Sequence, residues 1–214
     1  MTKNDFGLYL IITKPSFSYK KIAETAVKYN VKYLQLREKE LSDREILRAA
    51  GEIMSVTKGT ETRFVLNDRA DLAHICGADC LHLGQEDISI TDAKMICGEK
   101  VSEFGLSTHN LKQVKEAVKL KPDYIGFGPV FWTPTKKNPD PVTGTENIAE
   151  AIKLAGDIPV VAIGGINGEN LTSVLNAGAR NVCIVRYFMN SVHFETRVKE
   201  TIDILKDYGI ELRN

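Results

Sequence analysis

The sequence predicts a (β/α)8 TIM barrel, and three features of the 214-residue chain support this fold class. Eight short apolar runs alternate with eight amphipathic stretches, the pattern of parallel strands joined by helical crossovers. The alternation repeats about every 20–30 residues without a glycine- or serine-rich linker. Polar residues follow nearly every apolar run. The length is short for this fold but within its range, so we expect one domain over residues 1–214. An open doubly wound sheet is the competing architecture.

The predicted strands are short apolar runs, as expected where both faces of a parallel sheet are buried. They occupy residues 8–13, 33–37, 63–66, 80–83, 103–107, 124–127, 159–163 and 182–185. The predicted helices lie between and after these runs, at residues 18–29, 42–57, 69–76, 89–97, 109–119, 145–155, 167–177 and 191–207. Several have start signals: Ser42 and Glu45 form a capping box, and Asn110 and Asn167 stand at N-cap positions.

Composition and charge narrow the function classes. The apolar fraction of 43% and charged fraction of 26% are close to globular averages, which argues against disordered and fibrous proteins. Lys+Arg and Asp+Glu both number 28, so no net charge draws the chain to nucleic acid or to an anionic membrane. The apolar run at residues 8–12 is too short for a signal peptide or a spanning helix. Four cysteines in such a chain favour a reducing compartment, so we expect a cytoplasmic protein, with its oligomeric state left open between monomer and homo-oligomer.

Polar residues gather where the predicted strands end, which is where (β/α)8 barrels carry their active sites. Seven of the eight strands are followed by such residues, and this convergence favours the barrel over the open sheet. They are Gln35, Arg37 and Lys39; Asn67 and Asp68; Gln85, Glu86 and Asp87; Ser107 and His109; Thr133, Thr135, Lys136 and Lys137; Gly164 and Gly165; and Val185 and Arg186.

The second strand ends in residues that suit a phosphate. Gln35, Arg37 and Lys39 alternate and can therefore point the same way. Arg37 offers a planar fork to phosphate oxygens, and Lys39 offers a point charge. Lys136 and Lys137 supply a second cationic wall. The alternative is that these charges simply face solvent at a strand end and in a loop.

Two carboxylates at neighbouring strand ends predict a magnesium site. Asp68 and Asp87 each follow a strand, and adjacent parallel strands bring such residues close together. Mg²⁺ favours one or two carboxylates completed by substrate phosphates. With the basic residues opposite, the pair indicates a metal-bridged diphosphate. The alternative for Asp68 is a helix cap or an ion pair with Arg69.

A second anion site is predicted at the seventh and eighth strand ends. Gly164 and Gly165 let the backbone approach an anion closely, in the position where barrels hold phosphates. Arg186 would face the same phosphate. The alternative is that Arg186 points outward and pairs with a surface acid.

The remaining motifs give weaker indications of function. His74, Cys76, Cys80 and His82 lack the spacing of a zinc site, and residues 80–83 fit a buried strand better. No complete dinucleotide-binding or P-loop motif occurs. His109 could serve as a general base, or it could cap or pack the following helix.

Several longer stretches resemble the thiamine phosphate synthase family, in family order and over nearly the whole chain. They are QLREK at 35–39, LNDRADLA at 66–73, GADCLHLGQED at 77–87, GLSTHN at 105–110, DYIGFGPVFWTPTKK at 123–137 and AIGGI at 162–166.

The resemblance implies a transferase that joins a hydroxymethylpyrimidine diphosphate to a thiazole phosphate, or its carboxylate form, and releases pyrophosphate. It implies Mg²⁺ on Asp68 and Asp87, and Arg37, Lys136 and Ser107 as catalytic groups. The implied pyrimidine diphosphate site is Gln35, Leu36, Arg37, Glu38, Lys39, Asn67, Ser107 and Lys136. The implied thiazole phosphate site is Thr133, Pro134, Thr135, Gly165, Val185 and Arg186.

The chain departs from the family pattern at Arg186, where serine is common, and at Trp132, where proline is common. Two other functions could be carried by the same barrel. Thiazole tautomerases are associated with a histidine at the position of Pro129, so Pro129 favours the synthase. A non-catalytic phosphate sensor would be expected to lack a metal carboxylate or a basic residue, and all are present.

Overall fold

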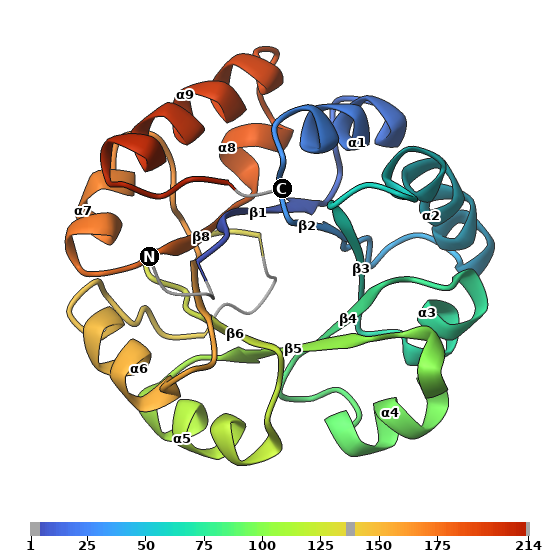
Figure 1. The fold of residues 1–214 in the computed structure, drawn as a ribbon, viewed down its shortest axis with the longest axis horizontal. Helices are drawn as coiled ribbons and strands as arrows, with labels where there is room; N and C mark the ends of the chain where they lie inside the picture. The colour runs from blue at the N-terminus through green and yellow to red at the C-terminus, as the bar shows by residue number, and fades with distance from the viewer. Residues whose placement is uncertain (1–4, 136–139, 213–214) are drawn as a thin grey trace.

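The computed structural model describes residues 5–135 and 140–212, and it confirms the (β/α)8 barrel. Eight parallel strands pair in chain order, and β1 pairs with β8 to close the barrel (Figure 1). The strands are β1 Gly7–Ile12, β2 Tyr33–Leu36, β3 Arg63–Asn67, β4 Cys80–Leu83, β5 Glu103–Thr108, β6 Tyr124–Phe127, β7 Val160–Ile163 and β8 Asn181–Ile184.

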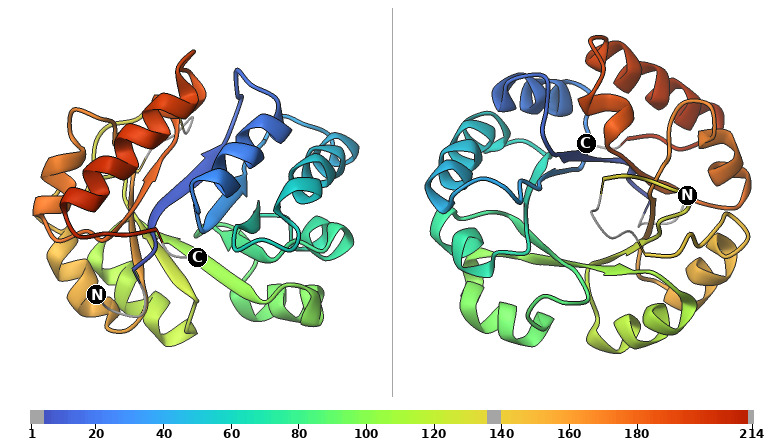
Figure 2. Two further views of the ribbon diagram at one scale, coloured as in Figure 1. Left: turned by 45° about the horizontal axis from the view of Figure 1, so that its top comes forward. Right: turned by 180° about the vertical axis from the view of Figure 1, so that it is seen from behind.

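Helices form an outer ring around the strands, as Figures 1 and 2 show. They are α1 Tyr19–Lys28, α2 Asp43–Thr57, α3 Ala70–Cys76, α4 Ile90–Cys97, the 3₁₀ helix η1 Gly98–Lys100, α5 Leu111–Leu120, α6 Ile148–Ala155, α7 Leu171–Asn176, α8 Arg186–Met189 and α9 Phe194–Asp207. No helix in the described parts of the chain is both long enough and apolar enough to cross a membrane.

Helix starts follow the local sequence closely. Ser42 and Glu45 form the predicted capping box on α2, and the Asn110 side chain accepts a hydrogen bond at the start of α5. Asn167 does not cap α7 as predicted. Its side chain accepts hydrogen bonds from the backbone N–H groups of Glu169 and Asn170, so it closes a turn before the helix begins at Leu171.

Two apolar layers result from the alternation of side chains along each strand. Alternate strand residues such as Leu8, Leu10 and Leu34 pack against the helices. The others fill the barrel, where the interior layer includes Tyr9, Tyr33, Val65, Cys80, Tyr124, Val161 and Cys183. This layer is a solid floor, and the polar residues lie above it.

The end of the chain differs from the prediction. The eighth strand was expected at 182–185, but it runs from Asn181 to Ile184 because the Asn181 side chain accepts hydrogen bonds from the backbone of Phe6 and Gly7 and fixes the start of the ladder. Val185 then leaves the extended conformation, with φ −116° and ψ −82°. Arg186 therefore begins the short helix α8, and the final helix starts at Phe194.

Candidate active site

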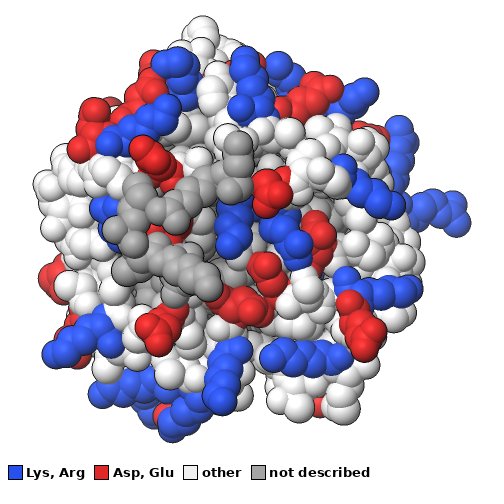
Figure 3. All heavy atoms as spheres, viewed as in Figure 1, with Lys and Arg blue, Asp and Glu red and all other residues white. Residues whose placement is uncertain are grey.

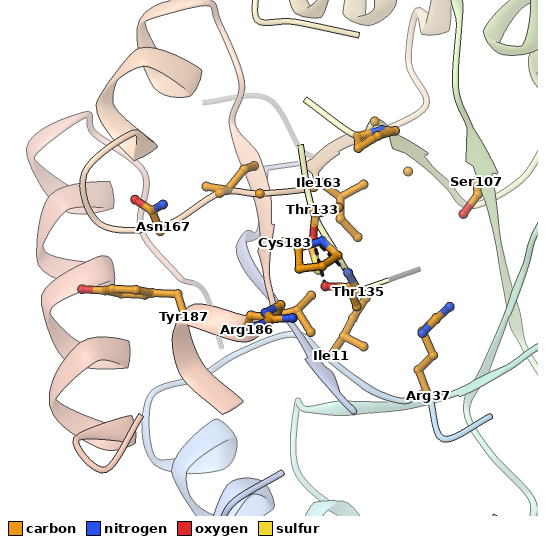
Figure 4. Close-up of a pocket in the computed structure, with 18 of the residues that line it drawn as sticks. Ile11, Arg37, Ser107, Thr133, Thr135, Ile163, Asn167, Cys183, Arg186 and Tyr187 are labelled. Atoms are coloured by element: carbon orange, nitrogen blue, oxygen red, sulfur yellow. Dashed lines mark hydrogen bonds between the residues drawn. The ribbon is translucent and has the colours of Figure 1, made fainter. Parts of the chain in front are cut away.

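A cavity of about 580 Å³ opens at the carboxyl ends of the strands (Figure 4). Ten of the predicted site residues line it: Gln35, Arg37, Asn67, Ser107, Thr133, Pro134, Thr135, Gly165, Val185 and Arg186. They come from six of the strands or from the segments that follow them. A second hollow of about 220 Å³ is lined by Leu36, Glu38, Lys39, Ile46, Asn67, Asp68 and Arg69. Asn67 belongs to both, so the two hollows adjoin.

The β2 side of the cavity presents Gln35 and Arg37. Gln35 is buried and donates a hydrogen bond of 2.9 Å from Nε2 to Asn67 Oδ1. The Arg37 side chain makes no hydrogen bond or ion pair with the described residues and extends towards the cavity (Figure 4). Burial lowers the pKa of Arg37, while the nearby carboxylates of Asp68 and Glu38 act in the opposite direction. A half-buried guanidinium without a close partner is suited to an anionic ligand.

The side chains of the two residues on either side of Arg37 do not line the larger cavity. Leu36 is 1% exposed and belongs to the apolar layer between strands and helices, so it borders the smaller hollow and does not line the larger cavity. The Glu38 carboxylate accepts hydrogen bonds from the Lys14 backbone N–H at 2.8 Å and from the Tyr19 hydroxyl at 3.3 Å. Burial raises the pKa of Glu38. Glu38 therefore ties β2 to the segment after β1.

Asp68 and Asp87 lie beside each other. Asp68 adopts φ +62°, and its backbone N–H donates to the His82 carbonyl at 2.8 Å, which anchors it next to the end of β4. Asp87 accepts a 2.6 Å hydrogen bond from the Gly84 N–H. Burial raises the pKa of Asp87; a hydrogen bond with Asp68 and the charge of Asp68 add to the increase. This effect requires the two carboxyl groups to be close neighbours.

The partner of Asp68 is Lys39, with Nζ 3.0 Å from Oδ2. The alternative pairing of Asp68 with Arg69 is wrong, because Arg69 instead binds Asp43 at 2.6 Å and Asp71 at 2.7 Å.

The carboxylate pair fits Mg²⁺ chemically. No cluster of three or more His, Cys, Asp or Glu residues occurs in the described ranges, so a metal here would need oxygens from a ligand. Mg²⁺ is commonly bound by one or two carboxylates and substrate phosphates. A divalent cation would offset both the burial of the Asp87 carboxylate and its repulsion by Asp68, which together raise the pKa of Asp87.

Ser107 faces the cavity from β5, and its closest side-chain partner is His82 on β4. Ser107 Oγ lies 2.8 Å from His82 Nε2, and the Ser107 carbonyl accepts a 2.6 Å hydrogen bond from Gln85 Nε2. His82 lines the cavity, although sequence reasoning treated residues 80–83 only as a buried strand. The alternation within β4 was the available signal, since Cys80 and His82 share one face and Leu81 and Leu83 the other.

Gly164 and Gly165 shape the opposite side of the cavity. Both have positive φ values, +102° and +67°. A Cβ on Gly164 would overlap Pro129, and one on Gly165 would lie 2.6 Å from the Trp132 carbonyl oxygen. The two glycines let the chain after β7 pass against the chain after β6. Trp132 itself is 71% exposed at the cavity mouth.

Arg186 lines the cavity from the first turn of α8. The alternative pairing with a surface acid does not occur, since Arg186 has no ion pair with any described residue. Thr133 and Thr135 lie nearby, with their hydroxyl oxygens 2.9 Å apart. Figure 4 shows Arg37 and Ser107 on one side of the cavity, and Arg186 and Tyr187 on the other. The cavity thus has a cationic group on each of two separated walls.

Lys136, with its neighbour Lys137, lies outside the described residues. His109 is engaged in packing: its Nδ1 lies 2.6 Å from the Gly128 carbonyl, its backbone N–H donates to Gln113 Oε1 at 2.6 Å, and Nε2 is 3.4 Å from Asp140. These contacts tie the ends of β5 and β6 together, and His109 also lines the cavity.

The distribution of charge on the surface agrees with the equal numbers of acidic and basic residues in the sequence. On the face shown in Figure 3, acidic and basic side chains are intermixed among uncharged residues. A single-sign surface of the kind that attracts nucleic acid is not present on that face of the described chain.

Comparisons of the chain with known proteins all indicate the same family. A profile described as thiamine monophosphate synthase matches residues 8–188. The thiamine-phosphate synthase of Dictyoglomus turgidum is 37% identical over 207 residues, covering 95% of this chain and 92% of that protein. The thiamine-phosphate synthase of Syntrophomonas wolfei is 35% identical over 204 residues. The match covers 94% of this chain and 96% of that protein.

A solved structure supports the same family. The thiamine phosphate pyrophosphorylase of Pyrococcus furiosus superimposes with a TM-score of 0.83 and 29% identity, over 96% of this chain and 98% of that one. Together with the profile match over most of the sequence, these similarities show that the chain belongs to the thiamine monophosphate synthase family.

Proposed function

We propose that this chain is a thiamine phosphate synthase: it condenses 4-amino-5-hydroxymethyl-2-methylpyrimidine diphosphate with a thiazole phosphate and releases pyrophosphate. The observation that supports the proposal is one cavity with an arginine on each of two separate walls. Arg37 stands on one wall with Asp68 and Asp87 close behind it, and Arg186 stands on the other wall. A diphosphate and a monophosphate can therefore bind together without sharing a site.

The diphosphate belongs on the Arg37 side. Asp68 and Asp87 would hold Mg²⁺, whose positive charge stabilises a leaving diphosphate. Arg37 would contact the same group from the cavity, and its lowered solvent exposure strengthens that interaction. Lys136 is assigned to this site by family resemblance. Asn67 borders both hollows and would align the diphosphate between them.

The pyrimidine ring belongs between Gln35 and Ser107, which both line the cavity. When the bond between the methylene carbon and the diphosphate oxygen breaks, positive charge spreads into the aminopyrimidine. The thiazole nitrogen then forms the new carbon–nitrogen bond. No protein base has to remove a proton in this sequence, which agrees with the engagement of His109 in packing contacts.

The thiazole phosphate belongs on the opposite wall. Arg186, Thr133 and Thr135 supply side-chain donors, and Gly165 and Val185 bring backbone close to the ligand. Pro134 completes the lining. We further propose that the protein works in the cytoplasm, on the basis of its four free cysteines.

The test is direct synthesis. Purified protein is mixed with both substrates and Mg²⁺, and thiamine phosphate is sought by mass spectrometry. Product should form only when both substrates and the metal are present. Conversion of a thiazole carboxylate phosphate into an isomer, without pyrophosphate release, would instead show a thiazole tautomerase.

A further inference from the structure

A line of four side chains runs from the cavity into the barrel interior. Ser107 Oγ lies 2.8 Å from His82 Nε2, His82 Nδ1 lies 3.2 Å from the Tyr124 hydroxyl, and that hydroxyl lies 2.9 Å from the Tyr9 hydroxyl. The residues come from β5, β4, β6 and β1. A group facing the ligand is thereby connected to the buried floor of the barrel.

Glycines make room for this line of side chains. A Cβ on Gly105 would overlap the Tyr124 ring, and a Cβ on Gly126 would touch His82 Cε1 at 3.6 Å. The His82 and Tyr124 rings are stacked, with centroids 5.6 Å apart and planes 18° apart. The ring positions are therefore set by the packing of the barrel.

The direction of the hydrogen bonds follows from counting donors. Tyr9 and Tyr124 are 2% and 1% exposed, and burial raises the pKa of both hydroxyls, so each keeps its single proton. The Tyr9 hydroxyl has only the Tyr124 hydroxyl as a hydrogen-bond partner among the described residues. If Tyr124 donated to Tyr9, the Tyr9 proton would be buried without an acceptor, which is unfavourable.

Tyr9 must then donate to Tyr124, and Tyr124 must donate to His82 Nδ1. A neutral imidazole that accepts at Nδ1 carries its proton on Nε2. His82 Nε2–H therefore donates to Ser107 Oγ, and the Ser107 hydroxyl keeps its own proton for another partner. The reverse order would leave Ser107 with lone pairs only.

We propose that His82, fixed as the Nε2–H tautomer by Tyr124 and Tyr9, is a positioning residue that aims the Ser107 hydroxyl proton at a hydrogen-bond acceptor of the bound ligand. Under the proposed function, on which this last identification rests, the acceptor is the ring nitrogen beside the amino group of the pyrimidine. Ser107 thus distinguishes a pyrimidine from a ring that carries C–H at that position.

The tautomer can be measured in the free protein by ¹⁵N NMR of the histidine side chains. The His82 signals, identified by their loss in His82→Gln, should show a protonated Nε2 and an unprotonated Nδ1. Tyr124→Phe removes the donor to Nδ1 and should give a mixture of tautomers. Tyr33→Phe is the matched control, because the Tyr33 hydroxyl binds Glu103 at 2.7 Å instead. A protonated Nδ1 in the wild-type protein would overturn the proposal.

Kinetics test the consequence for the ligand. The wild-type enzyme should have a KM for the pyrimidine diphosphate about 3- to 10-fold lower than for the analogue with C–H in place of that nitrogen. Tyr124→Phe and Ser107→Ala should lose this preference, whereas Tyr33→Phe should keep it. The KM for the thiazole phosphate should not change in any of them.

Full discrimination in both Tyr124→Phe and Ser107→Ala would refute the positioning role. A wild-type protein that makes no thiamine phosphate would refute the proposed function, and the NMR result would still decide the tautomer.

Discussion

Replacing Arg186 by serine tests the second anion site, where this chain departs from its family. Arg186 has no ion pair with a described residue, so its removal should leave stability nearly unchanged. A hydrogen bond to a charged group contributes about 1.5–3 kcal/mol. Arg186 is exposed, so solvent screening favours the lower half of that range, about 1.5–2 kcal/mol.

This energy corresponds to an increase of about 10- to 30-fold in the KM for the thiazole phosphate. The KM for the pyrimidine diphosphate should stay within about twofold, because its anion site lies on the Arg37 side of the cavity. Steady-state kinetics with each substrate varied in turn measure both constants. Arg48→Ser is the matched control, since Arg48 is an exposed arginine on α2 whose partner is Glu52. Equal shifts for the two substrates, or none for either, would refute the assignment.

Three other predictions test separate parts of the structure. Asp68→Ala and Asp87→Ala should each lower kcat/KM by at least about 100-fold, and EDTA should abolish turnover until Mg²⁺ is restored. Asp203→Ala is their control, because Asp203 pairs with Lys199 on α9 and lines neither hollow, and full activity in EDTA would remove the metal from the mechanism. Gly165→Ala should lower the free energy of unfolding by about 1 kcal/mol or more, measured by urea unfolding. The reason is that Gly165 has φ +67° and the added Cβ would meet the Trp132 carbonyl oxygen. An unchanged free energy of unfolding would contradict that geometry. Ser42→Ala removes the capping box of α2 and should lower the free energy of unfolding by about 1 kcal/mol, whereas the Ser55→Ala control should have a smaller effect.

The barrel could be predicted from sequence because its signals are local and repeated. Alternation at the end of β2 also predicted that Gln35 and Arg37 share the cavity side, since a period of two needs no tertiary information. Lys39, which was expected to point the same way, lines the smaller hollow instead. The capping box at Ser42 is equally local.

What could not be predicted depends on contacts between distant segments. Asp68 pairs with Lys39, whereas Arg69 pairs with Asp43 on α2, and both partners come from a part of the chain distant in sequence. The short helix at Arg186 arises where the chain leaves β8. His82 was missed because apolar neighbours on both sides made residues 80–83 resemble a strand buried on both faces, and only the closed barrel brings Tyr124 and Ser107 to it.

Under the proposed function, this cavity transfers an alkyl group from a diphosphate to a thiazole nitrogen. The most direct measurement uses a pyrimidine diphosphate with ¹⁸O in the oxygen that bridges the methylene carbon and the diphosphate. With thiazole phosphate and Mg²⁺ present, all of the label should appear in pyrophosphate, in equal amount to the thiamine phosphate formed. Label that stays on the pyrimidine, or pyrophosphate released without thiamine phosphate, would contradict this transfer.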